Sequence, residues 1–177
     1  MHTGFDHEST TTDVLAGLDL SGRRFVITGT SAGLGEEATR SIAAAGGSVV
    51  MLARDPGANA EAMGRVRAVV PDASLSVRRL DLANLSSVRS CAQGLIDDGQ
   101  PIDVLINNAG VMACPEGRTA DGYELQFGTN HLGHFELTRQ LMPAILAGTD
   151  SRIICLTSSA HDISDVDLSD PNFEHSA

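Results

Sequence analysis

The chain has 177 residues, 42% of them apolar, and a formal net charge of −11 at pH 7, which allows one domain with a buried core. A chain this acidic disfavours nucleic acid and anionic membrane surfaces as partners. Because it holds no run of about 20 apolar residues, no secretory leader and no Cys-x-x-Cys pair, we expect a cytoplasmic protein without membrane contact, disulfide framework or zinc site.

A polar lead-in over residues 1–20 is expected to be loose. Over residues 21–177, short β-branched apolar segments alternate with longer amphipathic ones, which predicts an α/β domain built on a parallel sheet with crossover helices. The expected strands are 25–28, 48–53, 75–80, 104–107 and 152–157. The expected helices are 34–45, 59–69, one beginning near 84, and 123–146, the last burying Phe135, Leu141 and Ile145.

A glycine-rich turn, Thr-Gly-Thr-Ser-Ala-Gly-Leu-Gly over residues 28–35, joins the first strand to the first helix. Gly29 permits a tight turn, Gly33 lets a ligand approach the backbone, and Gly35 lets the helix pack closely on the strand. Free N–H groups at a helix start attract phosphate. The pattern predicts a site for a diphosphate, with a purely structural turn as the alternative.

The spacing Thr-Gly-x-x-x-Gly-x-Gly resembles the nucleotide-binding motif of the short-chain dehydrogenase/reductase family. Four further matches follow in family order: Asp81-Leu82, Asn107-Asn108-Ala109-Gly110, Asn130, and Ser158-Ser159. The resemblance extends from about residue 20 to residue 177. The local sequence of these motifs is most similar to the branch with retinol-dehydrogenase-like and WW-domain-oxidoreductase-like enzymes.

The resemblance implies a Rossmann-type, doubly wound parallel sheet with strand order 3-2-1-4-5, and a dinucleotide cofactor held at the carboxyl ends of the strands. It assigns cofactor contacts to Gly29, Thr30, Ser31, Gly33, Leu34, Gly35, Arg54, Asp81, Leu82, Asn108, Ala109 and Gly110. Asp81 would hydrogen-bond the adenine amino group with Leu82 behind the ring, although an aspartate there can also be a helix cap.

Arg54 directly follows the second strand, where the adenosine ribose is expected. A carboxylate at this place holds the ribose 2′-OH of NAD, whereas an arginine can pair with the 2′-phosphate of NADP. Ala53 offers no carboxylate, and Asp55 is expected to be a turn residue. The sequence therefore favours NADP, with NAD possible because the glycine turn has no basic residue.

The resemblance also implies catalytic roles for Asn130, which would hold a water in a proton relay, and Ser159, which would hydrogen-bond the substrate carbonyl. Ser158 is adjacent, so this assignment is open by one residue. His131 and His134 have no further metal ligands in view, and no Gly-x-Ser-x-Gly elbow marks a hydrolase. The expected partner is a small-molecule alcohol or carbonyl substrate, with its identity and the oligomeric state left open.

In the family, a tyrosine donates the proton to the carbonyl oxygen and a lysine four residues later lowers its pKa. All 12 basic residues of this chain are arginines, and its single tyrosine, Tyr123, is followed at plus four by Phe127. We therefore expect an NADP(H)-dependent oxidoreductase that interconverts an alcohol and a carbonyl, of which this chain is a C-terminally truncated fragment with little or no turnover.

The alternative is a non-catalytic NAD(P)-binding or regulatory module. A methyltransferase ranks last, because it would need an acidic residue where Arg54 stands. In either of the first two cases, the fifth strand would leave an apolar sheet edge open, which predicts a destabilised or aggregation-prone chain.

Overall fold

The computed structural model describes residues 4–162, 167 and 169–175. Its centre is a five-stranded sheet in the order β3-β2-β1-β4-β5, with every neighbouring pair parallel. The predicted fold class and strand order are therefore confirmed. The strands are β1 (Arg24–Thr28), β2 (Ser48–Ala53), β3 (Leu75–Arg79), β4 (Val104–Asn107) and β5 (Arg152–Cys155).

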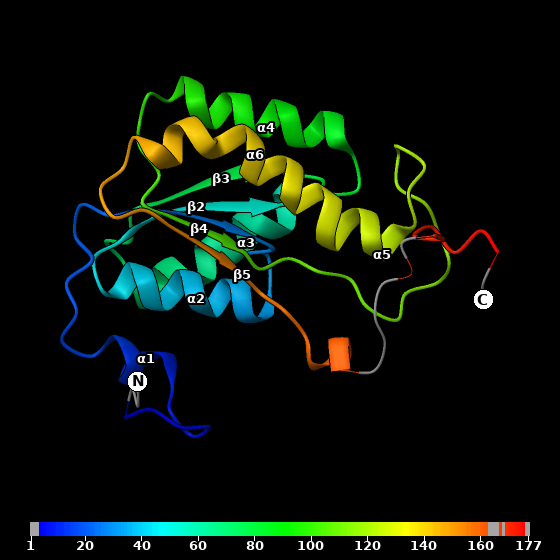
Figure 1. Cartoon of the computed structure of the whole chain (residues 1–177). Helices are drawn as coiled ribbons and strands as arrows, with labels where there is room; N and C mark the ends of the chain where they lie inside the picture. Colours follow the sequence, from blue (N-terminus) through cyan, green and yellow to red (C-terminus); the bar gives the residue numbers. More distant parts are fainter. Residues whose placement is uncertain (1–3, 163–166, 168, 176–177) are drawn as a thin grey trace.

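Helices cover both faces of the sheet, with α4 and α6 on one side and α2 and α3 on the other (Figure 1). In the part of the chain that the structure describes, no helix is both long and apolar enough to cross a membrane. The helices are α1 (Thr11–Leu15), α2 (Gly33–Ala44), α3 (Pro56–Val69), α4 (Leu85–Asp97), α5 (Leu125–Phe127), the π-helical η1 (Gly128–Leu132), α6 (Gly133–Leu146) and the 3-10 turn η2 (Ser159–Asp162).

The sheet separates two apolar clusters, because successive side chains of a strand point to opposite faces. Val26, Leu52 and Leu105 pack with α4 and α6, whereas Ile27 and Met51 pack with α2 and α3. All five side chains are fully buried. The central strands are thus covered on both faces, which explains their uninterrupted apolar sequences.

The predicted helix over 123–146 begins later than expected and is not uniform. The carboxylate of Glu124 accepts the backbone N–H groups of Gln126 (2.8 Å) and Phe127 (2.6 Å) and so starts the helix at α5. The π-helical turn η1 then widens the helix before α6. Such single π turns occur often at functional sites.

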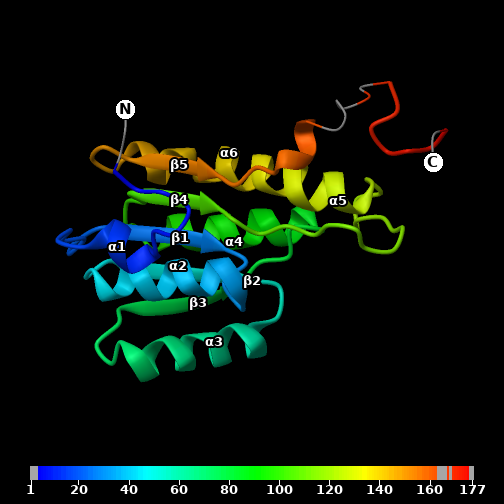
Figure 2. The ribbon, with the colours of Figure 1, turned by 90° about the horizontal axis from the view of Figure 1, so that it is seen from below.

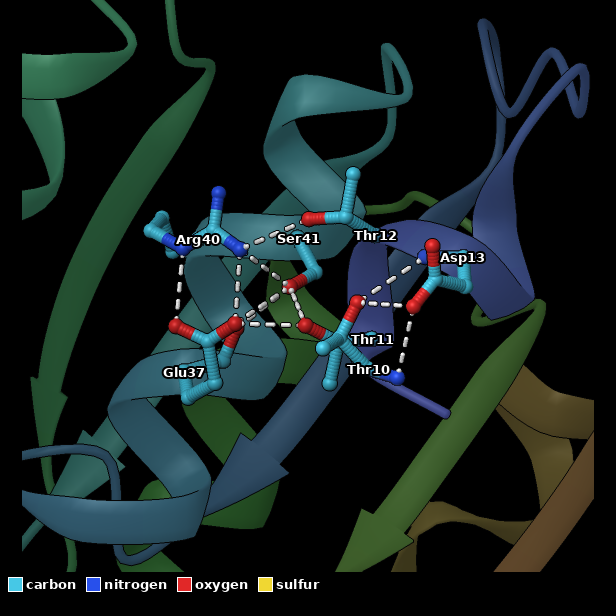
Figure 3. A network of polar contacts seen from close by, with 7 residues as sticks. All are labelled: Thr10, Thr11, Thr12, Asp13, Glu37, Arg40 and Ser41. Carbon is cyan, nitrogen blue, oxygen red and sulfur yellow. Dashed lines mark hydrogen bonds and ion pairs between the residues drawn. The ribbon is translucent and has the colours of Figure 1, made fainter. Parts of the chain in front are cut away.

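The expectation of a loose lead-in was wrong for α1. A capping box between Thr10 and Asp13 starts this short helix. On α2, the Glu37 carboxylate accepts hydrogen bonds from the Thr11 hydroxyl (2.5 Å) and from the Arg40 guanidinium (2.6 and 2.7 Å) (Figure 3). The bond from Arg40 is the main reason that the pKa of Glu37 is lowered to about 2. These polar contacts to α2, together with Leu15, which packs against the apolar cluster on this face, hold α1 in place.

β5 forms one edge of the sheet (Figure 2). Ile153, Ile154 and Leu156 are 40%, 44% and 47% exposed. Within the described residues, no strand pairs with the outer side of β5. The edge is therefore apolar and open, as predicted.

Candidate functional site

The glycine-rich turn leaves no room for side chains at two of its three glycines. A Cβ on Gly29, whose φ is +73°, would lie 2.9 Å from the Ala109 Cα, and a Cβ on Gly35 would lie 2.2 Å from the Gly29 carbonyl oxygen. At Gly33, whose φ is +62°, a Cβ would meet nothing within 4 Å. The turn is therefore closed toward the protein and open outward, which is the geometry that lets a ligand approach the backbone.

The start of α2 differs from the starts of α3, α4 and α5. Side chains of Asp55, Asn84 and Glu124 accept backbone N–H groups at the starts of α3, α4 and α5. At α2 the capping position is Ala32, which makes no such bond. The first N–H groups of α2 are thus left without a side-chain acceptor, and such groups favour an anion.

Thr28, the last residue of β1, joins this turn to the loop after β4. Its hydroxyl oxygen accepts the backbone N–H groups of Asn108 and Ala109, both at 2.9 Å. The side-chain amide of Asn108 in turn donates to the Thr28 carbonyl at 2.7 Å. These hydrogen bonds therefore bring the predicted turn and the predicted Asn-Ala-Gly segment together.

His134 extends this network to the helix after the loop. Because the Thr28 oxygen already accepts two N–H groups, its own O–H donates to Nε2 of His134, 2.9 Å away. Nδ1 of the ring then carries the proton and donates to the Asn130 carbonyl at 2.8 Å. Burial is the largest cause that lowers the pKa of His134, in keeping with this neutral form. Sequence reasoning considered His134 only as a metal ligand and missed this role.

Asn130 lies within η1 and faces the segment that follows Gly110. Its Oδ1 accepts the Val111 N–H at 2.8 Å, and its Nδ2 donates to the Val111 carbonyl at 2.7 Å. The side chain of Asn130 therefore anchors the loop after β4, while its carbonyl is bonded to His134.

A cavity of about 700 Å³ opens beside these residues at the carboxyl ends of β4 and β5. The amide Nδ2 of Asn107 donates to Thr138 (3.0 Å), but its Oδ1 is buried with no partner in the structure. Phe135 is 61% exposed beside the cavity, so its predicted place in the core was wrong. The lining includes Asn107, Asn108, Ala109, Gly110, Val111, Met112, Asn130, His131, His134, Phe135, Cys155, Leu156 and Ser158.

Two residues assigned to the cofactor turn their side chains inward. The Thr30 hydroxyl is buried and donates to Asn59 Oδ1 at 2.8 Å, and Leu82 is 6% exposed within the core. Ser31 is partly exposed, and Leu34 is 74% exposed at the start of α2. Thus Ser31 and Leu34 can offer side chains to a ligand, whereas Thr30 can offer only its backbone.

Of the remaining assigned residues, Arg54, Asp81 and Ser159 do not line the cavity. Arg54 is exposed and has no hydrogen bond or ion pair among the described residues. Asp81 follows β3 and its carboxylate accepts the Ala83 N–H at 3.1 Å, while Asn84 caps α4. Ser158 lines the cavity, but Ser159, the first residue of η2, is not among its lining residues.

A metal centre finds no support in the described part of the chain, where no group of three or more His, Cys, Asp or Glu side chains is placed to hold an ion.

A parallel sheet in this order, with a side-chain-free turn and an uncapped helix at the carboxyl ends of its strands, defines a Rossmann-type dinucleotide-binding protein. The match to a family model makes this assignment specific. Residues 23–166 match the short chain dehydrogenase model, and the chain belongs to that family.

The curated relatives place the chain in the retinol-dehydrogenase-like branch. Retinol dehydrogenase 13 of Homo sapiens is 39% identical over 155 residues, which cover 88% of this chain and 47% of that protein. The chain thus spans about half the length of the curated relatives that it matches.

Solved structures agree with the fold. A crystal structure of an uncharacterized protein from Mycobacterium Paratuberculosis superposes with a TM-score of 0.80 at 40% identity, over 90% of this chain and 55% of that one. A metagenomic short-chain oxidoreductase in complex with NADP has a TM-score of 0.65 at 26% identity, over 76% of this chain and 61% of that one.

Proposed function

We propose that this chain forms the cofactor-binding part of an oxidoreductase that uses NADP(H) to interconvert an alcohol and a carbonyl. The observation that carries the proposal is the uncapped start of α2 beside a turn in which Gly29 and Gly35 leave no space for a side chain. An anion such as a diphosphate would take the place that a capping side chain takes in α3 and α4.

The residues present fit a dinucleotide. The N–H groups at the start of α2 would hold the diphosphate, Asp81 the adenine amino group, and the segment Asn108–Gly110 the nicotinamide ribose. Held there, the nicotinamide would supply or accept a hydride. The protein would orient it against the cavity, whose lining includes Asn107, Asn130 and Ser158.

Two observations support NADP over NAD. The guanidinium of Arg54 has no partner among the described residues, so it is available for a 2′-phosphate. Asp55, the residue after Arg54, accepts the N–H groups of Gly57 (2.8 Å) and Ala58 (3.1 Å) as the cap of α3. Its capping role leaves it poorly placed to hold a ribose 2′-OH.

Turnover needs a proton donor that this chain does not encode. No lysine is present, and Tyr123 stands before α5 with no basic residue four positions on. Asn130 and Ser158 or Ser159 would border the reacting atoms, but no phenol with a lowered pKa joins them. We propose that the 177-residue chain binds cofactor without appreciable carbonyl reduction.

The same absence keeps a second function in view, a non-catalytic NAD(P)-binding or regulatory module. Both proposals require dinucleotide binding, and they differ in whether a partner or a longer chain completes the site with a Tyr-x-x-x-Lys pair.

The test is titration of the purified chain with NADPH and NADH, followed by nicotinamide fluorescence. We expect a Kd for NADPH of roughly micromolar, weaker binding of NADH, and no reduction of added carbonyl compounds. Arg54→Ala should weaken the binding of NADPH about tenfold, since it removes one charge-assisted contact to the 2′-phosphate. The affinity for NADH should be nearly unchanged.

Circular dichroism provides the control for folding in this test. A folded chain that binds neither nucleotide would overturn the proposed function, and measurable carbonyl reduction would overturn the requirement for the missing tyrosine and lysine.

A further inference from the structure

We propose that Arg65, supplied by α3, is a second arginine of the 2′-phosphate site. This inference rests on the NADP(H) binding proposed above. It answers a difficulty in the sequence, because the glycine turn over residues 28–35 contains no basic residue.

Arg65 reaches the turn although it stands 34 residues after Ser31 in the sequence. Its Nη2 donates to the Ser31 carbonyl at 3.1 Å. The contact is possible because α2 and α3 lie against each other on one face of the sheet (Figure 1). A cation from a distant element therefore borders the stretch that should meet the adenosine ribose and the diphosphate.

Arg54 borders the same stretch from β2. The backbone N–H groups of Gly29 and Thr30 donate to the Leu52 carbonyl, at 2.7 and 3.4 Å. Arg54 stands two residues after Leu52, directly beyond the carboxyl end of β2. The turn is thus flanked by an arginine that directly follows β2 and an arginine of α3.

The donors of Arg65 are only partly used. Nε and Nη2 each donate to the Glu36 carboxylate at 2.8 Å, and Nη2 also donates to Ser31. Nη1 has no partner among the described residues, and the side chain is 52% exposed. A guanidinium has five N–H donors, so the two on Nη1 are free for phosphate oxygens.

Glu36 provides the rival explanation that the experiment must separate. It stands in the first turn of α2, where its charge would oppose a bound anion, and Arg65 offsets that charge. If offsetting Glu36 were the whole role of Arg65, losing the arginine would weaken every phosphate-bearing ligand alike. Direct contact with the 2′-phosphate would instead weaken only ligands that carry it.

The experiment measures binding of 2′,5′-ADP and 5′-AMP by calorimetry, and of NADPH and NADH by fluorescence. The variants are Arg65→Ala, Arg65→Gln, Glu36→Gln, the double variant Glu36→Gln with Arg65→Ala, and Arg67→Ala. Arg67 is the matched control: it lies on the same helix, but its Nη2 donates to the Leu75 carbonyl at the opposite end of the sheet.

We expect both Arg65 variants to weaken the binding of 2′,5′-ADP and NADPH about tenfold. Their affinities for 5′-AMP and NADH should change less than about twofold. Arg67→Ala should leave all four affinities unchanged. Adding Glu36→Gln to Arg65→Ala should not restore binding of 2′,5′-ADP.

Equal weakening of all ligands, restored by the double variant, would overturn the inference, as would unchanged affinities in Arg65→Ala. In both outcomes the wild-type chain still binds NADPH, so the proposed function stands. Failure of the folded wild-type chain to bind any dinucleotide would instead overturn the proposed function and this inference together.

Discussion

At the residue scale, the hydrogen bonds of the neutral His134 ring connect three segments that meet at the site. The ring accepts from Thr28 at the end of β1 and donates to Asn130 in η1, while Thr28 holds the loop after β4. A protonated ring would have no lone pair for the Thr28 hydroxyl and would place a charge in a buried site. Neutral His134 is therefore part of what holds the site together.

The pH dependence of stability follows from this. Because the pKa of His134 is lowered in the folded protein, the unfolded chain binds more protons as the pH falls below the ordinary value of 6.5. We expect the free energy of unfolding, measured with urea, to decrease between about pH 7.5 and about pH 5.5. Glu37 and Glu136, with pKa values of about 2, stay ionised in the folded protein over this range.

The variant His134→Gln should be less stable by about 1–3 kcal/mol at neutral pH and should lose most of this pH dependence. The exposed His131, three residues earlier, is the control, and His131→Gln should keep it. An unchanged pH dependence in His134→Gln would contradict the assigned hydrogen bonds.

At the element scale, one glycine in α2 is required for packing, whereas one glycine in α3 lowers the stability of its helix. Gly35 in α2 is in close contact with the turn, since a Cβ there would lie 2.2 Å from the Gly29 oxygen and 2.7 Å from the Asn108 amide. Gly64 in α3 has open space around it and a helical backbone. The first is needed for packing, whereas the second only weakens its helix.

The same substitution should therefore change stability in opposite directions. We expect Gly35→Ala to destabilise the fold by about 1–3 kcal/mol through overpacking and to abolish dinucleotide binding. Gly64→Ala should stabilise it by about 0.5–1 kcal/mol, because alanine is the better helix former. Urea unfolding measures both, and a Gly35→Ala variant as stable as the wild type would show that α2 does not approach the turn this closely.

At the scale of the whole molecule, the sheet is well covered at its centre and open at β5. The exposed side chains Ile153, Ile154 and Leu156 lie along this edge and just beyond it. Unpaired backbone groups beside apolar side chains form a surface on which another strand can pair. We expect the chain to self-associate as its concentration rises.

Ile154→Lys should reduce this association, because a charge on an edge strand opposes pairing with a second strand. Val69→Lys is the matched control: it also replaces an exposed apolar side chain, 64% exposed, but at the end of α3. Sedimentation velocity over a range of concentrations measures the effect. Equal relief by both variants would mean that general charge, and not the β5 edge, controls association.

Much of the fold could be predicted from local signals. Apolar periodicity placed the five strands within a few residues, and the glycine spacing placed the turn and the start of α2. The beginning of the helix near residue 125 was missed, because the capping carboxylate of Glu124 was not recognised as a start signal. Phe135 was misplaced because it lies in the regular helix α6 six residues before Leu141, and six steps of about 100° put it roughly 120° around the helix from that buried side chain.

The sequence by itself determined the α/β class and the position of the turn, because these follow from patterns spanning a few residues each, and its resemblance to a known family supplied the strand order. The tertiary structure alone decided the tautomer of His134, the approach of Arg65 to the turn and the docking of α1. These depend on contacts between residues 106, 34 and 26 positions apart. No local pattern carries that information, because only the packing of helices on the sheet brings such residues within hydrogen-bond distance.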